Sequence, residues 1–168
     1  IYIYSKNQNQ KHNEANCKTE FFIENLKFLE IELSKFNIPL TILNSEGFED
    51  NAEIIYDYVE NHSLHKVFLN NQFGFDEIER DESVKNYLKS KNIEFENFDE
   101  QVVFAPGSIL TAEGKPYSVF TPFKRRWIEN FNLDLLDIEF EYTKKNTTKN
   151  KSNINEFDFQ FKKSNLVD

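Results

Sequence analysis

The sequence predicts an α/β domain in which helices cover both faces of a doubly wound parallel sheet. Short apolar segments typical of buried strands alternate with longer segments whose apolar residues recur at helical spacing. Each connection between successive strand segments is long enough to hold a helix, which a parallel crossover requires. At 168 residues, the chain has room for one such domain with its own core.

The first half of the chain contains two predicted strands and two predicted helices. Residues 1–4, IYIY, alternate like the middle of a buried strand, and the polar stretch 5–18 is expected to be a surface loop. A helix is predicted from Thr19 to Phe36, because apolar side chains recur there at spacings of three and four. This apolar stripe consists of Phe22, Leu26, Leu29, Leu33 and Phe36. Pro39 ends the helix, PLTIL follows as a second strand, and a second helix follows the turn NSEGFED.

The second half continues the same alternation. KVFL is a third predicted strand, a third helix is predicted from Asp76 to about Lys91, and IEFENF is a fourth predicted strand. Beyond Phe131 the pattern fades, so residues 132–168 are expected to form a linker or tail. Within this tail, INEFDFQF alternates and is predicted to be an edge strand or a segment that docks on a neighbour. The α/β domain itself is expected to cover residues 1–131.

The start of the chain departs from the usual pattern. The sequence contains no Met and opens directly on a strand-like alternation. We therefore expect a Rossmann-like sheet that lacks its first strand. Such sheets bind ligands in the loops that follow the carboxyl ends of their strands. Residues 5–18 and 70–77 are accordingly the candidate ligand loops.

The balance of charge limits the partners of this chain. Its net charge is −9 at pH 7 and its isoelectric point is near 4.9, which argues against non-specific binding of DNA or of an anionic membrane through the overall field. No apolar run approaches the ~20 residues that span a bilayer, and no signal-like segment opens the chain. We expect a cytoplasmic monomer that binds no membrane.

Several common chemistries lack their motifs. The sequence contains neither G-x-G-x-x-G nor G-x-x-x-x-G-K-[ST], the glycine-rich loops that cradle phosphates. The side chains of His12, Cys17, His62 and His65 match no common zinc spacing, so no metal site is expected. Catalysis by Cys17 would need a nearby base and an electropositive setting, and we expect it to be a solvated loop residue instead.

The acidic segment FDEIERDE has two interpretations. Acidic side chains in the first turn of a helix complement its dipole by ~0.3–1 kcal/mol each, and this accounts for the later acids of the segment. Arg80 is expected to pair with a neighbouring acid. Asp76 and Glu77 instead lie at a strand-to-helix loop, where a carboxylate can accept two parallel hydrogen bonds from the N–H edge of a pterin or guanine. For these two residues both interpretations stay open.

KPYSVFTPFKRRW, residues 115–127, is a basic and aromatic island in this acidic chain. DNA binding would use its basic side chains on phosphates and its aromatic rings for stacking. The structural interpretation, which we favour, places Pro122 at the first position of a helix with Thr121 as its N-cap. The buried stripe of that helix would be Phe123, Trp127 and Phe131.

Two stretches of the sequence resemble a known family. NNQFGFDEIERDESVKNYL and then FDEQVVFAPGSILTAEGKPYSVFTPFKRRW are similar to the amino-terminal α/β domain of the DNA photolyase and cryptochrome family. The similarity is greatest to bacterial deoxyribodipyrimidine photolyases, which repair cyclobutane pyrimidine dimers. The combination of ERD, PG.ILT..GKPY.VFTPF...W and the length between them is specific. The resemblance covers residues 1–131.

The resemblance implies that the parent protein is a flavoprotein lyase of DNA repair. Family members repair pyrimidine dimers in damaged DNA by light-driven electron transfer from reduced FAD, which a carboxyl-terminal helical domain holds. This sequence contains neither that domain nor the family's opening W-F-R-x-D-L-R strand. The resemblance therefore implies no catalytic residue here, and it makes the helical flavin domain a partner in cis.

The resemblance also implies a site for a light-harvesting antenna chromophore, often methenyltetrahydrofolate. Folate-binding members use a His in the loop after the strand that corresponds to IYIY, and His12 lies there. They also use a polar residue followed by Glu just before the ERD-like helix start, and Asp76 and Glu77 occupy those positions. Many folate binders have Asn in place of Asp76, and two adjacent carboxylates repel each other. Whether the antenna is altered, weakly held or lost stays open.

Two alternatives to a repair enzyme stay open as well. A blue-light receptor of the cryptochrome branch would contain the same domain without repair activity. A stand-alone α/β module for small molecules would involve no light chemistry and would bind nucleotides in preference to folates.

Overall fold

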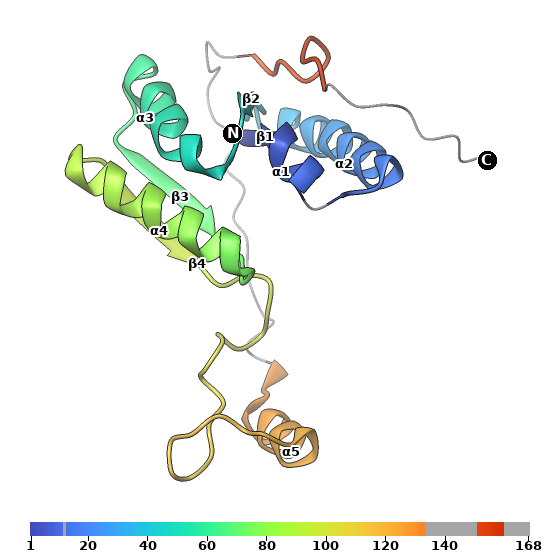
Figure 1. Ribbon diagram of the computed structural model, residues 1–168, viewed down its shortest axis with the longest axis vertical. Helices are drawn as coiled ribbons and strands as arrows, with labels where there is room; N and C mark the ends of the chain where they lie inside the picture. Colours follow the sequence, from blue (N-terminus) through green and yellow to red (C-terminus); the bar gives the residue numbers. More distant parts are fainter. Residues whose placement is uncertain (12, 134–150, 160–168) are drawn as a thin grey trace.

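The computed structural model describes residues 1–11, 13–133 and 151–159. Its short parallel strands and packed helices confirm the predicted α/β class (Figure 1). The elements are β1 (Tyr2–Ser5), α1 (Lys6–Lys11), α2 (Asn16–Ser34), β2 (Ile42–Ser45), η1 (Phe48–Asp50), α3 (Asn51–Asn61), β3 (Lys66–Asn70), α4 (Phe75–Ser90), β4 (Glu94–Phe98) and α5 (Phe120–Asn130). The four predicted strands and the helices between them are thus present, with boundaries shifted by a few residues.

The strands form two parallel pairs. β1 pairs with β2 in a register that places Tyr2 opposite Ile42, and β3 pairs with β4 with Lys66 opposite Glu94. In the described part of the chain each pair is a two-stranded sheet of its own. Helices connect the two strands of each pair, which is the crossover that parallel neighbours need.

The packing of α3 on α4 makes the first core. Apolar side chains of the two helices form a buried cluster together with Ile93, the residue before β4. The cluster consists of Ala52, Ile55, Val59, Val84, Leu88 and Ile93. Leu88 is 0% exposed and Val59 only 2%. Because close-packed side chains tolerate little movement, this cluster fixes the direction in which α4 runs.

A second core lies between the β1–β2 pair and α2. It consists of Tyr4, Leu26, Leu40, Ile42 and Ile154. The predicted apolar stripe of α2 is only partly buried, since Phe22 and Leu29 are 44% and 43% exposed. Thr19, Ile23 and Leu26 are the buried residues, so the face that packs is rotated from the predicted one.

Residues 151–159, in the stretch expected to be a linker or tail, pack against this second core. Asn153 accepts a hydrogen bond from the Ile42 N–H at 2.7 Å and donates one to the Ile42 carbonyl at 3.0 Å. Ser152 Oγ accepts another from the Leu40 N–H at 3.0 Å. These side chains satisfy backbone groups of β2 and the residues before it, in place of a further strand. The described part of INEFDFQF forms a turn, and its last two residues lie outside the described ranges.

The predicted surface loop 5–18 contains a helix instead. α1 has no apolar face, so periodicity could not reveal it. Its side chains make hydrogen bonds to residues far away in the chain. One runs from Asn7 Nδ2 to the Glu46 carboxylate at 3.0 Å. Cys17, expected in the same loop, lies in the first turn of α2.

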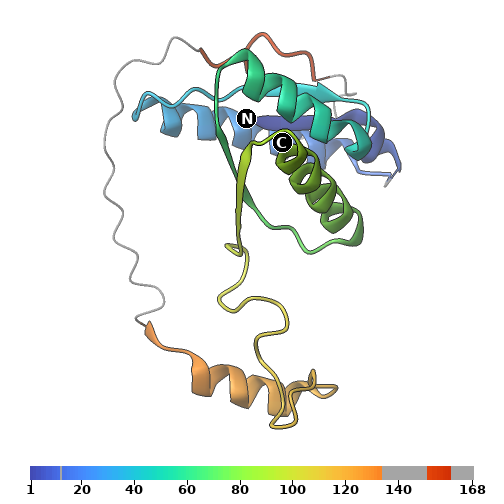
Figure 2. The same cartoon turned by 90° about the vertical axis from the view of Figure 1, so that its left-hand side faces the viewer.

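α5 lies away from the α/β body in both views (Figures 1 and 2). Its N-cap is Val119, so Thr121 and Pro122 lie inside the first turn and the predicted Thr121 cap is wrong. None of the residues of α5 is buried, but two members of the predicted aromatic stripe do pack. The ring of Trp127 contacts that of Phe104 edge-on, with 5.3 Å between the ring centroids. It also stacks on the ring of Phe131, with 5.2 Å between the centroids. The basic side chains of the island remain exposed.

Ile154→Ala tests whether the tail belongs to the core. Ile154 is 3% exposed, and removing such a side chain is expected to lower the free energy of unfolding by about 2–5 kcal/mol. Ile128→Ala is the matched control. Because Ile128 is 56% exposed, this substitution should change the free energy of unfolding by less than about 0.5 kcal/mol. Urea unfolding followed by circular dichroism measures the free energy of unfolding of both variants. Equal, small changes would mean that the tail does not pack.

Candidate functional site

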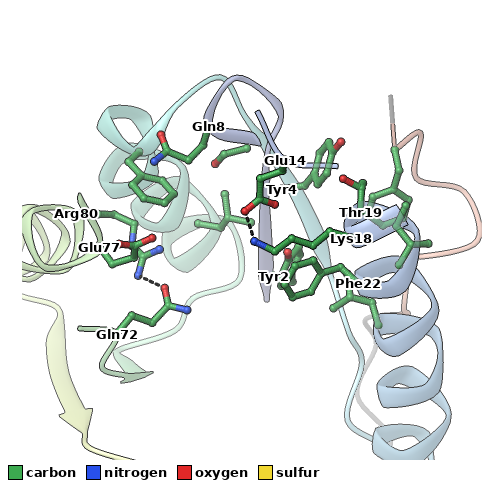
Figure 3. A pocket seen from close by; sticks show the side chains of 16 residues that line it. Tyr2, Tyr4, Gln8, Glu14, Lys18, Thr19, Phe22, Gln72, Glu77 and Arg80 are labelled. Atoms are coloured by element: carbon green, nitrogen blue, oxygen red, sulfur yellow. Dashed lines mark hydrogen bonds and ion pairs between the residues drawn. The ribbon is translucent and has the colours of Figure 1, made fainter. Parts of the chain in front are cut away.

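A cavity of about 310 Å³ lies between β1, the first turns of α2 and the start of α4 (Figure 3). All four residues of β1 line it. Figure 3 shows α4 side chains on one wall and α2 side chains such as Phe22 on the opposite wall, with Tyr2 between them. Cavities that hold small molecules are about 300–1,000 Å³ in volume and combine apolar walls with a few polar groups. The composition and size of this cavity fit a ligand of modest size.

Glu77 lies on the α4 wall of this cavity. It is the third residue of the helix and follows the N-cap Gly74, and its carboxylate lies so close to Gly74 that a Cβ there would overlap it. A larger residue at position 74 would displace the end of the flexible Glu77 side chain, since the backbone φ of −70° is ordinary. Among the described residues, no hydrogen bond or ion pair uses the Glu77 carboxylate. Its oxygens are available as acceptors for a ligand.

Arg80 lies one turn further along the same wall. Its Nε and Nη2 donate to the Asp81 carboxylate at 2.8 and 2.7 Å, and Nη2 also donates to Gln72 Oε1 at 3.0 Å. The guanidinium carbon lies 4.8 Å from the centre of the Phe48 ring, a cation–π contact. The Arg80 side chain is only 15% exposed. A carboxylate, an amide and an aromatic ring together hold this cation in one orientation beside the cavity.

Asp76 faces α1 rather than this cavity. Lys11 Nζ lies 3.0 Å from the Asp76 carboxylate, and Gln8 Nε2 donates to the same oxygen at 3.3 Å. The Lys11 side chain is 63% exposed, so the ion pair contributes at most about 1 kcal/mol to stability. It does place a positive charge beside one of the two adjacent carboxylates, which reduces their mutual repulsion.

These contacts bring the two candidate ligand loops together. Gln8 and Lys11 come from the loop after β1, and Asp76 comes from the loop after β3. His12 follows Lys11 directly in the chain but lies outside the described residues. Glu77 and Gln8 both line the cavity, whereas Asp76 lines a neighbouring hollow of about 250 Å³.

β1 contributes two tyrosines, Tyr2 and Tyr4, and a serine with a buried hydroxyl to the wall of the cavity. Burial, and then the nearby Tyr4 and Glu14, raise the pKa of Tyr2 above its ordinary value of 10.0. Ser5 is 7% exposed, and its buried Oγ has no hydrogen-bond partner among the described residues. A buried hydroxyl without a partner loses its hydration at a cost of about 1–3 kcal/mol. Because this oxygen has less than 1 Å² of exposed surface, Ser5 contributes to the wall of the cavity but does not present its hydroxyl to a ligand.

The sequence patterns mark neither Arg80 nor Tyr2 as a site residue, and they indicate Gln72 only as part of the candidate ligand loop 70–77. Arg80 was expected only to pair with an acid, and it does pair with Asp81. The spacing of three between Glu77 and Arg80 places them on one helix face, and this signal could have drawn attention to Arg80. The contacts of Arg80 with Phe48 and Gln72 depend on the fold and leave no local signal.

A family model described as DNA photolyase matches residues 1–144. This chain belongs to the DNA photolyase family. The deoxyribodipyrimidine photo-lyase of Salmonella typhimurium is 32% identical to it over 135 residues, which cover 80% of this chain and 28% of that protein. The deoxyribodipyrimidine photo-lyase of Escherichia coli is 32% identical over 129 residues, which cover 77% and 27%. Both relatives confirm the predicted similarity to bacterial deoxyribodipyrimidine photolyases.

The chain spans about 28% of the length of the curated relatives that it matches. Among solved structures, a bacterial class III photolyase from Agrobacterium tumefaciens aligns with a TM-score of 0.49 and 24% identity, covering 55% of this chain and 18% of that one. The family match extends past α5 and ends before the docked residues 151–159.

Within residues 1–11, 13–133 and 151–159, no group of three or more His, Cys, Asp or Glu side chains could hold a metal ion. None of the helices there has both the length and the hydrophobicity to cross a membrane.

The raised pKa of Tyr2 predicts how stability depends on pH. The folded state holds this phenolic proton more tightly than the unfolded chain does. The contribution of Tyr2 to stability should therefore be complete and constant below its ordinary pKa of 10.0, and it should be lost as the pH rises from there through the higher folded pKa. An ultraviolet titration of tyrosinate formation should include a late component that Tyr2→Phe removes. A late component that persists in Tyr2→Phe would contradict this assignment.

Proposed function

We propose that this photolyase-family chain is the antenna-chromophore-binding domain of a light-dependent DNA photolyase that repairs pyrimidine dimers. The proposed chromophore is methenyltetrahydrofolate, and its pterin ring would bind in the cavity beside Glu77. The observation that supports this most directly is the Glu77 carboxylate, which lines the cavity and is not engaged by any described residue. The family match to residues 1–144 supports the parent activity.

The residues of the cavity suit the chemistry of a pterin. The ring presents two N–H donors side by side, and a carboxylate accepts two parallel hydrogen bonds of this kind. The aromatic walls, to which Tyr2 and Phe22 contribute, suit a flat ring. When bound, the antenna absorbs near-ultraviolet or blue light and passes the energy to a flavin, without a bond forming or breaking.

The three predicted site residues take different roles in this proposal. Glu77 binds the ring, and Asp76 keeps α1 in place through Lys11 and Gln8. His12 would bind the chromophore from the segment that follows α1. Asp76 therefore acts as a positioning residue, which fits the presence of Asp where many folate binders have Asn.

The parent protein would supply the rest of the reaction. Photolyase-family proteins bind an antenna chromophore and FAD, and they act on damaged DNA. We infer that FAD binds in a helical domain joined in cis to residues 1–131, and that repair takes place there. No catalytic role is assigned to this chain, and we propose that the parent is a cytoplasmic monomer.

Glu77→Ala tests the proposed ring contact. Loss of charge-assisted hydrogen bonds worth about 1.5–3 kcal/mol should weaken binding of methenyltetrahydrofolate to the 168-residue chain about tenfold or more. The antenna's near-ultraviolet absorbance, measured in equilibrium dialysis, reports the bound fraction.

Glu53→Ala is the matched control for this experiment. Glu53 is also the third residue of its helix, α3, but it is exposed and does not line the cavity. Both substitutions remove an acid that complements a helix dipole, so they should change stability alike. Unchanged affinity in Glu77→Ala, or equal losses in the two variants, would contradict the proposed site.

A further inference from the structure

Glu77 and Arg80 lie three residues apart on one face of α4, and both line the cavity. Glu77 is an acceptor that no described residue uses, and Arg80 is a cation whose side chain is only partly exposed. Figure 3 shows the two side chains next to each other at the same wall. Together they offer a ligand an acceptor group beside a donor group.

Arg80 has one unused donor nitrogen. Nε and Nη2 make the bonds to Asp81 and Gln72, whereas Nη1 has no hydrogen-bond partner in the described part of the chain. The Asp81 carboxylate that orients the guanidinium is itself only 12% exposed. A guanidinium oriented in this way loses little further freedom when Nη1 donates to a ligand.

The edge of a pterin ring has a matching order of groups. It presents a carbonyl oxygen, then a ring N–H, then an amino group, which is one acceptor followed by two donors. Guanine presents the same order. A carboxylate of the protein can accept hydrogen bonds from the ring N–H and the amino group. The ring carbonyl then needs a hydrogen-bond donor from the protein, placed beside that carboxylate.

We propose that Arg80 supplies this donor, so that Nη1 binds the ring carbonyl while Glu77 binds the two N–H groups. This inference rests on the proposed function and assigns a specificity role to Arg80. Because a guanidinium has only donors, it selects for an oxygen acceptor at this ring position. Glu77 sets the affinity for the N–H pair, and Arg80 sets the preference for the carbonyl.

The test compares two probes on the intact 168-residue chain. 6-Hydroxymethylpterin carries the carbonyl, and its 4-thio analogue keeps both N–H donors but presents sulfur, a weak acceptor. Quenching of probe fluorescence gives both dissociation constants. We expect the wild-type chain to bind the oxo compound about tenfold more tightly than the thio compound, because a charge-assisted hydrogen bond is lost.

Arg80→Gln should reduce this preference to about twofold or less, since the shorter amide does not reach the carbonyl. Arg125→Gln is the control, because Arg125 is exposed on α5, away from the cavity, and should leave the preference unchanged. Should Arg80→Gln fail to fold, the affinities of the wild-type chain for the two probes still test whether a donor binds the ring carbonyl. Equal binding of both probes there overturns the role of Arg80.

The outcomes separate this inference from the proposed function. If hydroxymethylpterin does not bind, or binds independently of Glu77, the proposed site is wrong and the role of Arg80 fails with it. If it binds through Glu77 but without preference for oxygen over sulfur, only the role of Arg80 is wrong. Guanosine and 6-thioguanosine form a second pair of probes. Tighter binding of guanosine than of hydroxymethylpterin would support recognition of the edge but overturn the pterin as its natural source.

Discussion

The candidate site depends on the apolar contact between α3 and α4. Val84 and Leu88 on one face of α4 pack against α3 and hold the helix at a fixed angle, while the first two turns of α4 present Glu77 and Arg80 to the cavity. Because the same rigid helix carries both groups, their spacing does not depend on loop conformation. A helix that packed loosely would leave the carboxylate and the guanidinium without a common orientation.

Charge is balanced locally around this helix, although the chain as a whole is strongly acidic. Arg80 neutralises Asp81, and Lys11 neutralises Asp76. Glu77 is the acid of the first turn that no described cation neutralises, so it remains the acceptor at the cavity. The exposed Lys11 pair is weak and screened by salt, whereas the Arg80 pair is well shielded from solvent. Arg80 therefore orders the site more than the α1 contacts do.

Local patterns predicted the parts of this structure that local forces produce. α4 was evident from its period and its acidic first turn, and the strands from their short apolar runs. α1 was missed because it has no apolar face and is held by bonds to distant residues such as Asp76. The docking of Asn153 on β2 and the contact of Arg80 with Phe48 were missed for the same reason, since they join residues far apart in the chain. For the site, resemblance and loop position indicate Asp76 and Glu77, but only the fold shows that Glu77 lines the cavity while Asp76 faces α1.

The most direct test of the proposed ring site is an amide NMR titration of the ¹⁵N-labelled chain with methenyltetrahydrofolate. Binding of the ring beside Glu77 should change the chemical shifts of β1, of Gln72 and of the first two turns of α4, while the shifts of α5 stay constant. Shift changes centred on α5 and its aromatic contacts, or no changes at saturating chromophore, would contradict a ring site beside Glu77.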